Sequence, residues 1–297
     1  MRKKMTAALL ALTLLCTGLL SGCVTADPSD GSGDKGITVA ISSDTGTMDP
    51  AGSIALTYLA YSVSALDELL TYDENGEIEY RAAESYDVND DSTVWTFHLR
   101  EDALWSDGSP VTSADFMNTI TRALDPASGS GYANYLFPIE NAEAVYNGEA
   151  DMDSLGVETP DDHTIVFRLA EPCVYFLDLL RLPVYTPSCS EYADSVDSGW
   201  DRDPGTSLSN GPFCLAEYVP DQYFVLEKNK YYWNADAINL DTITYRFFDD
   251  TQSMANAYEA GEVDVATALS STVMEAYEGT DDLFVTDQIA TRYIYMN

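Results

Sequence analysis

Residues 94–124 decide the fold, and they read VWTFHLREDALWSDGSPVTSADFMNTITRAL. The first six residues alternate the large apolar side chains of Trp95, Phe97 and Leu99 with smaller or polar ones, which is the period of a half-buried strand. Residues 105–108, Trp-Ser-Asp-Gly, then supply turn chemistry, because Asp and Ser bond nearby backbone groups and Gly accepts positive φ. The stretch therefore predicts a strand followed by a tight turn.

A helix is predicted directly after this turn. Thr112 and Asp115 have the spacing of a capping box, in which two residues at a helix start bond each other's backbone. Phe116, Ile120 and Leu124 then recur on one helical face. The Asp-Pro pair that follows ends the helix, since proline disfavours the helical conformation of the residue before it. On spacing alone, this strand–turn–helix unit is typical of a scaffold without ligand contact.

The first 23 residues have the pattern of a lipoprotein signal. Three basic residues at 2–4 precede an apolar run at 6–20, which is too short for a comfortable membrane span. Residues 20–23, Leu-Ser-Gly-Cys, provide the small residues before a cysteine that a lipoprotein signal peptidase accepts. We expect residues 1–22 to be removed and Cys23 to carry lipid, including palmitate. The alternative is a plain secretory signal with an incidental cysteine.

The next segment, residues 24–36, is rich in Ser, Asp and Gly and cannot bury enough apolar surface to fold. As a flexible tether after Cys23 it would reach on the order of 20 Å. The folded part then begins with the strand-like run at 37–41. The sequence therefore predicts a protein held by lipid alone at the outer face of the cell membrane, on its periplasmic or extracellular side.

The charge of the chain is strongly acidic, with 14 basic and 50 acidic residues. Removal of residues 1–22 would leave 11 basic residues and all 50 acidic ones. This balance excludes an electrostatic footprint for nucleic acid and disfavours anionic lipid as a direct partner. Because the acids are scattered along the sequence, we interpret them as a solubilising surface and not as a cation site.

The remaining side chains offer no recognisable catalytic or metal site. Cys173, Cys189 and Cys214 are an odd set for an oxidising compartment, so one pair could bridge, but the spacing does not say which. The histidines are His98 and His163, and no Cys-x-x-Cys spacing, phosphate loop or Gly-x-Ser-x-Gly elbow occurs. We therefore expect no cofactor, no metal and no enzymatic activity.

Helix-like and strand-like segments alternate over the rest of the chain, which indicates an α/β fold. Helical spacing covers residues 56–70, 176–182 and 253–260. Strand-like runs lie at 164–169, 223–226 and 242–248, and residues 263–265 begin a further extended piece. A chain of this length normally makes about two domains.

Short motifs follow one another along residues 47–297. They are Thr-Met-Asp-Pro at 47–50, Trp-Ser-Asp-Gly at 105–108, Asn-Gly-Pro-Phe at 210–213, Tyr-Tyr-Trp at 231–233 and Tyr-Ile-Tyr-Met-Asn at 293–297. With these motifs in this order, the chain resembles the family 5 extracellular solute-binding proteins, the oligopeptide- and dipeptide-binding lipoproteins of ABC transporters. Most of the motif residues are of the kind that makes turns and core.

The resemblance implies an α/β fold of the periplasmic-binding-protein-like kind, type II, cluster C. Lobe I would comprise residues 37–66 and 190–297, with a family-specific domain inserted at 67–189. Members of the family continue well past the last motif to build a second lobe. The resemblance therefore implies that this chain is an N-terminal portion without that lobe, and without the acidic group that holds a peptide's amino terminus there.

By resemblance, the function would be capture of oligopeptides for an ABC importer, with the permease and ATPase subunits as partners. The peptide would pair through its main chain like an added strand. Ile54, Ala55 and Leu56 match the segment that lines the family's cleft, and Tyr132 matches an aromatic residue that approaches bound peptide. The alternatives are core packing for Ile54 and Leu56, and packing on its own domain for Tyr132.

The sequence leaves other functions open. Binding proteins of the same fold take nickel, heme, opines or oligosaccharides, and a chain with two histidines makes nickel less favoured. A surface hydrolase would need a carboxylate pair in a deep cleft, one member having a raised pKa. A surface adhesion module would need an exposed aromatic patch.

Overall fold

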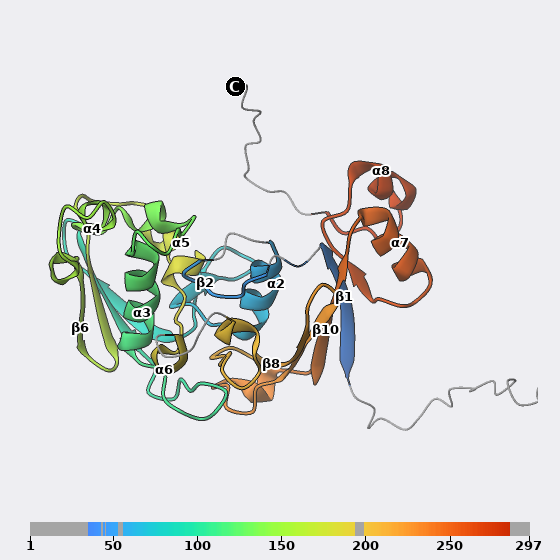
Figure 1. Cartoon of the computed structure of the whole chain (residues 1–297), viewed down its shortest axis with the longest axis horizontal. Coiled ribbons are helices and arrows are strands. Elements are labelled where there is room, and N and C mark those ends of the chain that lie inside the picture. Colours follow the sequence, from blue (N-terminus) through green and yellow to red (C-terminus); the bar gives the residue numbers. More distant parts are fainter. Residues whose placement is uncertain (1–34, 43, 45, 53–55, 194–198, 286–297) are drawn as a thin grey trace, which may run out of the picture. The chain divides into compact units, whose positions relative to one another are not determined.

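The computed structural model describes residues 35–285 apart from 43, 45, 53–55 and 194–198. Five strands form a mixed sheet in the order β11-β1-β10-β9-β8 (Figure 1). They are β1 (Gly36–Ser42), β8 (Phe213–Val219), β9 (Tyr223–Lys228), β10 (Thr242–Phe248) and β11 (Val265–Ala266). Strand β1 pairs in parallel with β10 and β11, whereas β8, β9 and β10 pair antiparallel. The strands predicted at 37–41, 223–226 and 242–248 are confirmed as β1, β9 and β10.

Helices cover both faces of this sheet. The α-helices are α2 (Leu56–Ala65), α3 (Ser113–Leu124), α4 (Ala142–Tyr146), α5 (Phe176–Leu179), α6 (Ser190–Ala193), α7 (Thr251–Glu259) and α8 (Ser271–Met274). Val39 of β1 belongs to the main hydrophobic core together with Tyr61 of α2, whereas the next residue, Ala40, packs with Met254 of α7. Because successive side chains of a strand point to opposite faces, α2 and α7 lie on opposite faces of the sheet. The alternation of helices and strands confirms the predicted α/β class.

A second sheet comes from the middle of the chain and has four antiparallel strands in the order β4-β5-β7-β6. Its strands are β4 (Ala83–Val88), β5 (Val94–Leu99), β6 (Val157–Asp161) and β7 (Thr164–Arg168), and β2 (Leu70–Tyr72) pairs separately with β3 (Ile78–Tyr80). Trp95 and Phe97 are buried on one face of β5, as the alternation predicts. With Phe167, Phe176 and Tyr185 they make a row of rings at centroid distances of 5.4 to 6.1 Å. Each such pair adds about 0.5–1.5 kcal/mol beyond the area that it buries.

The turn and the helix after β5 form as predicted. The Gly108 N–H donates to the Trp105 carbonyl at 2.8 Å, and Gly108 has a φ of 91°, which a residue with a side chain rarely adopts. The capping box of α3 is present, with the Asp115 carboxylate accepting the Thr112 N–H at 2.8 Å. The same carboxylate accepts the ring N–H of Trp105 at 3.3 Å. Asp115 therefore joins the turn to the helix.

Two predicted helices are too long. The helix predicted at 56–70 ends at Ala65, because the Ala65 carbonyl accepts the Gly211 N–H at 3.0 Å and residues 70–72 pair as a strand instead. In the segment predicted as a helix at 176–182, α5 ends at Leu179, and a separate 3₁₀ turn begins at Pro183. The 3₁₀ turns are η1 (Ala133–Leu136), η2 (Met152–Ser154), η3 (Pro183–Tyr185), η4 (Trp200–Arg202), η5 (Ala235–Ala237) and η6 (Glu275–Tyr277).

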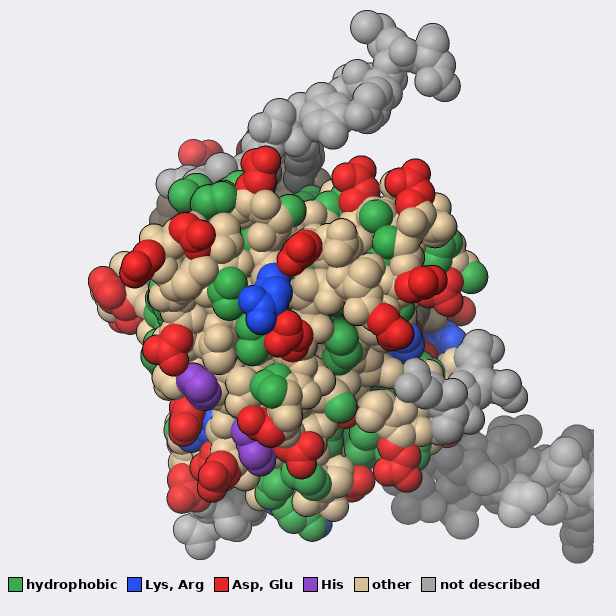
Figure 2. Space-filling model, turned by 90° about the vertical axis from the view of Figure 1, so that its left-hand side faces the viewer, with side chains coloured by type: hydrophobic (Ala, Val, Ile, Leu, Met, Phe, Trp, Pro, Cys, Tyr) green, Lys and Arg blue, Asp and Glu red, His purple; other side chains and the backbone are tan. Residues whose placement is uncertain are grey.

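The acidic residues are spread over the face of the molecule that Figure 2 draws. On the face drawn in Figure 2, carboxylates stand singly among polar and apolar side chains, and Lys and Arg are few. Cys173 and Cys189 are buried, Cys214 is half-buried, and all three are free thiols in this structure. Within the described ranges, no helix combines the length and the hydropathy that crossing a bilayer requires.

Candidate functional site

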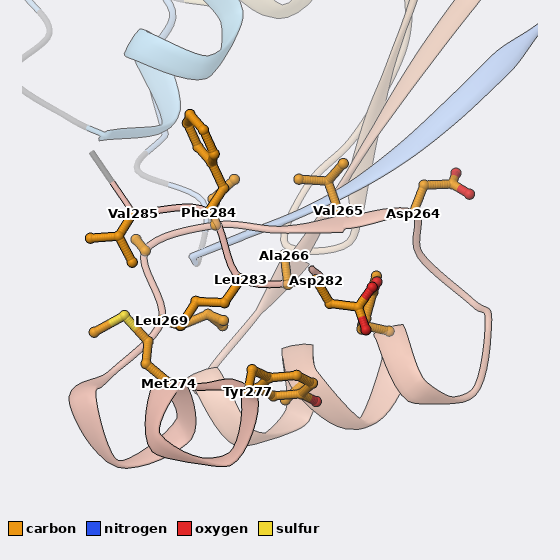
Figure 3. A pocket seen from close by; sticks show the side chains of 14 residues that line it. Asp264, Val265, Ala266, Leu269, Met274, Tyr277, Asp282, Leu283, Phe284 and Val285 are labelled. Carbon is orange, nitrogen blue, oxygen red and sulfur yellow. The ribbon is translucent and has the colours of Figure 1, made fainter. Parts of the chain in front are cut away.

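A groove of about 670 Å³ lies beside β11, which stands at one end of the sheet order. Ligand pockets commonly have volumes of about 300–1,000 Å³. Residues of α7, β11, α8 and η6 and the segment 282–285 line it, including Leu269, Met274 and Leu283. In Figure 3 these three side chains gather between the strand and the helices, whereas Phe284 points away from them. The groove therefore has an apolar floor and the volume of a ligand site.

Hydrogen bonds to β1 fix the position of β11. The Asp264 carboxylate accepts the Thr38 N–H at 2.7 Å, and the Asp264 N–H donates to the Thr38 carbonyl at 2.8 Å. Just past β11, the N–H and the hydroxyl of Thr267 donate to the Ala40 carbonyl at 3.1 and 3.0 Å. These bonds at both ends hold a two-residue strand in one register.

The helices beside the groove begin and end at local sequence signals. At the start of α7 the Asp250 carboxylate accepts the Ser253 N–H at 2.8 Å, and at the start of α8 the Ser270 hydroxyl accepts the Val273 N–H at 3.4 Å. Between them, Gly261 has a φ of 71°, which ends α7 and returns the chain toward β11. Caps and a glycine turn therefore set where the groove opens.

Two tyrosines, Tyr258 and Tyr277, form an aromatic wall of the groove, with ring centroids 6.4 Å apart in an edge-to-face arrangement. The charge of Asp282 is the largest cause of a raised pKa at Tyr258. The Tyr277 hydroxyl donates to Oε1 of Glu259 at 3.0 Å. The pKa of Tyr277 is raised mainly by partial desolvation and next by this hydrogen bond. Each hydroxyl of the aromatic wall thus lies beside an acidic side chain.

Of the site residues predicted from the sequence, Tyr132 is the one whose side chain the structure describes. Outside the described residues lie Cys23, Ile54 and Ala55. Leu56 opens α2, but its side chain is outside the described part as well. Tyr132 is half-buried just before η1, with its ring 5.5 Å from that of Tyr135, in a region that contacts α3, α4 and η3. A ligand-facing role for these residues stays a prediction.

Sequence reasoning did not single out the groove. Residues 263–265 were expected to be extended, and β11 starts there, but the lining residues come from four separate elements with no common spacing. The helix cap at Asp250 and the turn at Gly261 were the available signals, and they predict elements without predicting a cavity. The aromatic wall in particular combines Tyr258 of α7 with Tyr277 of η6.

The loop that leads to the predicted cleft segment is held by polar contacts. Asp49 accepts two hydrogen bonds from the Arg122 guanidinium, at 2.6 and 2.7 Å. The Asp201 carboxylate accepts the Met48 N–H at 2.6 Å and the Thr47 hydroxyl at 2.8 Å. The Thr-Met-Asp-Pro motif therefore fixes the path of the chain before α2.

The central motifs meet at one junction. The Asn210 side chain exchanges two 3.0 Å hydrogen bonds with the Asp67 backbone, and the ring N–H of Trp233 donates to the Asp67 carboxylate at 3.1 Å. The Ser106 hydroxyl of the Trp-Ser-Asp-Gly turn accepts the Ser209 N–H at 3.2 Å. These motifs therefore connect chain segments and lie outside the lining of the groove.

Two adjacent carboxyls at this junction have raised pKa values. Burial raises the pKa of Asp67 to about 6, against the opposing effects of the Trp233 hydrogen bond and the Arg81 charge. Burial, and the neighbouring Asp67 charge, raise the pKa of Glu68 to about 7. Neither carboxyl lines the groove beside β11. Across the described residues, no three His, Cys, Asp or Glu side chains are placed to hold a metal ion.

Residues 77–297 match the family described as bacterial extracellular solute-binding proteins, family 5 Middle. The periplasmic oligopeptide-binding protein OppA of Escherichia coli is 33% identical over 262 residues, 86% of this chain and 48% of OppA. The probable deoxycholate-binding periplasmic protein YgiS of Escherichia coli is 33% identical over 225 residues, 75% of this chain and 42% of YgiS. The chain spans about half the length of the curated relatives it matches.

Among solved structures, the substrate-binding domain of an oligopeptide ABC transporter from Bacillus anthracis is similar, with a TM-score of 0.77 at 30% sequence identity. The likeness covers 84% of this chain and 48% of that one. It confirms the predicted periplasmic-binding-protein-like fold.

Proposed function

The chain belongs to family 5 of the bacterial extracellular solute-binding proteins, and we propose that it captures oligopeptides at the outer face of the membrane and delivers them to the permease of an ABC importer. OppA is named for oligopeptide binding, and the Bacillus anthracis structure is titled as part of an oligopeptide ABC transporter. The permease and ATPase subunits of such an importer are the protein partners that this proposal requires.

The groove beside β11 is the observation that carries the proposal. Among the described strands β11 pairs with β1 alone, and we place the peptide as an added strand along the other edge of β11. The apolar floor next to that edge, with Leu269, Met274 and Leu283, can take the side chains of such a peptide. Main-chain pairing gives affinity for peptides in general, and the floor adds a preference for apolar residues.

The proposed role is binding without catalysis. The groove brings together apolar side chains, two tyrosines and the acids Asp264 and Asp282. Asp264 is already engaged by the Thr38 N–H at 2.7 Å, and no nucleophile-and-base pair lines the groove. A transported ligand must leave chemically unchanged, and this lining suits that requirement.

A second candidate ligand is an amphipathic steroid anion. YgiS is 33% identical to this chain, the same identity as OppA, and its name indicates deoxycholate. An apolar groove would accept the steroid body, whereas the acids beside the aromatic wall oppose its carboxylate. We therefore place oligopeptides first.

The organisation predicted from the sequence belongs to the same proposal. Residues 1–22 would be the signal peptide, Cys23 the lipidated residue and 23–36 the tether. Lobe I would be built from 37–66 and 190–297 around an inserted domain at 67–189, with Ile54, Ala55, Leu56 and Tyr132 facing the ligand. The lipid anchor is tested by growth with radioactive palmitate. We expect labelled protein that Cys23→Ser abolishes, and labelling that survives this substitution would refute the anchor.

Equilibrium binding tests the function itself, with protein purified from its native host and a mixture of short peptides as ligand. We expect binding that Met274→Ala weakens about fivefold, because the variant loses apolar area from the groove worth about 1 kcal/mol. Met152→Ala, a half-buried methionine on η2, is the matched control and should leave affinity unchanged. Deoxycholate that binds while peptides do not would contradict the proposal.

A further inference from the structure

We infer that the groove prefers oligopeptides in which Lys or Arg stands beside apolar residues. This inference rests on the proposed peptide-binding function and names the chemical class of its ligand. It comes from the charge of the segment that builds the groove and from what surrounds the aromatic wall.

The segment that builds the groove is acidic throughout. Residues 247–285 contain nine Asp or Glu and no Lys, Arg or His. Among the described residues, the ion pair of Glu262 with Arg246, at 3.5 Å, is the basic contact that this segment receives. Within the part of the chain that the structure describes, most of these carboxylates form no ion pair.

Two of these carboxylates lie at the aromatic wall. Glu259 accepts the Tyr277 hydroxyl at 3.0 Å, and Asp282 lines the groove together with Tyr258, whose pKa its charge raises. Both acids are exposed, so they keep capacity for another donor. A Lys ammonium or Arg guanidinium placed on a tyrosine face within about 6 Å gains cation–π attraction, and the adjacent carboxylates add to it.

The apolar floor supplies the second half of the preference. Leu269, Met274 and Leu283 gather beside the aromatic wall (Figure 3). A Lys or Arg side chain can lay its methylene stem on this floor while its charged end stays at the carboxylates. A neighbouring apolar residue of the peptide fills the rest of the floor. An acidic peptide gains the apolar contact, but its carboxylates are repelled by those of Glu259 and Asp282 at the aromatic wall.

Electrostatics would also act before contact. A groove lined by one sign of charge raises the encounter rate of ligands of the opposite sign, by about 10-fold to 1,000-fold at low salt. Such steering is screened at high ionic strength. The preference for basic peptides should therefore weaken as salt is added, which a preference based on shape would not do.

Three peptides test the inference with protein purified from its native host. They have the sequence Ala-X-Phe-X-Ala with X as Lys, Gln or Glu, and their affinities are measured by calorimetry at low and high salt. We expect the Lys peptide to bind about tenfold more tightly than the Glu peptide at low salt, with Gln between them. At high salt the ratio should fall to about threefold or less.

A paired variant links the preference to the groove. The double substitution Asp282→Asn with Glu259→Gln removes both carboxylates at the wall and should reduce the Lys-to-Glu ratio to about threefold at low salt. The matched control, Asp153→Asn with Glu149→Gln, makes the same charge change on exposed residues near η2 and α4. It should leave the ratio unchanged.

The outcomes separate this inference from the function on which it rests. If the three peptides bind with equal affinity, or the control lowers the ratio as much as the groove variant does, the charge preference is wrong and peptide binding stands. If none of the peptides and no peptide mixture binds, the proposed function itself is wrong.

Discussion

A single residue, Gly211, sets how closely the chain approaches the end of α2. A Cβ at this position would lie 2.7 Å from the Ala65 carbonyl carbon and 2.8 Å from the Leu66 nitrogen. Both are backbone atoms, which cannot rotate away as a side chain can. The contact also carries the 3.0 Å hydrogen bond from the Gly211 N–H to the Ala65 carbonyl, which ends α2. The glycine is therefore required by a close approach and not by its own φ.

Gly211→Ala should lower the free energy of unfolding by about 2 kcal/mol, because the backbone around Ala65 must shift to admit the methyl group. Urea denaturation measures this change. Gly52→Ala is the control, since no heavy atom lies within 4 Å of its added Cβ. It should change stability by less than about 1 kcal/mol. Equal losses in the two variants would show that the close approach at Gly211 is not the cause.

Whole elements could be predicted from the sequence where their signals are local. The capping box of Thr112 and Asp115 fixed the start of α3, and the alternation around Phe97 fixed β5. The end of α2 could not be predicted this way, because the bond that ends it comes from Gly211, far along the chain. Helical periodicity continued past Ala65 in the sequence, and a tertiary contact overrode it.

The groove, like the end of α2, depends on contacts between distant segments that local sequence patterns do not predict. Its floor depends on β11, a strand of two residues that exists because Asp264 and Thr267 bond to β1. Neither residue has a pattern that predicts such a partner. The resemblance supplied Ile54, Ala55, Leu56 and Tyr132 as ligand-facing residues, and the groove itself became visible only in the assembled sheet. Sequence therefore predicted the fold and the family, whereas the ligand-facing role of those four residues stays a prediction.

At the scale of the whole molecule, acidity acts on stability as well as on ligand choice. The formal net charge is −36, and like charges repel one another more in the compact state than in the unfolded chain. The junction of Asp67 and Glu68 adds to this cost, because burial disfavours the ionised form of both carboxyls. The nearby guanidinium of Arg81 lowers the pKa of both groups without cancelling that effect. Both contributions weaken the folded protein as pH rises.

The sign for Glu68 follows from its pKa, which is 4.5 in an unstructured chain and about 7 in the folded protein. Between these values the folded state holds more protons than the unfolded state, so the free energy of unfolding decreases as pH rises. The contribution of Glu68 is fully present below about pH 4.5 and is lost as pH passes through about 7. Gln at this position imitates the protonated side chain at every pH.

Glu68→Gln should therefore gain stability over the wild-type protein as pH increases, by about 1–2 kcal/mol between pH 5 and pH 8 once solvent screening of this half-buried group is allowed for. Urea denaturation at several pH values across this window measures the difference. Glu74→Gln, on an exposed residue between β2 and β3, is the matched control and should follow the wild-type curve. Parallel curves for Glu68→Gln and wild type would mean that Glu68 ionises as freely in the folded protein as in the unfolded chain, and the junction would then impose no cost on its charge.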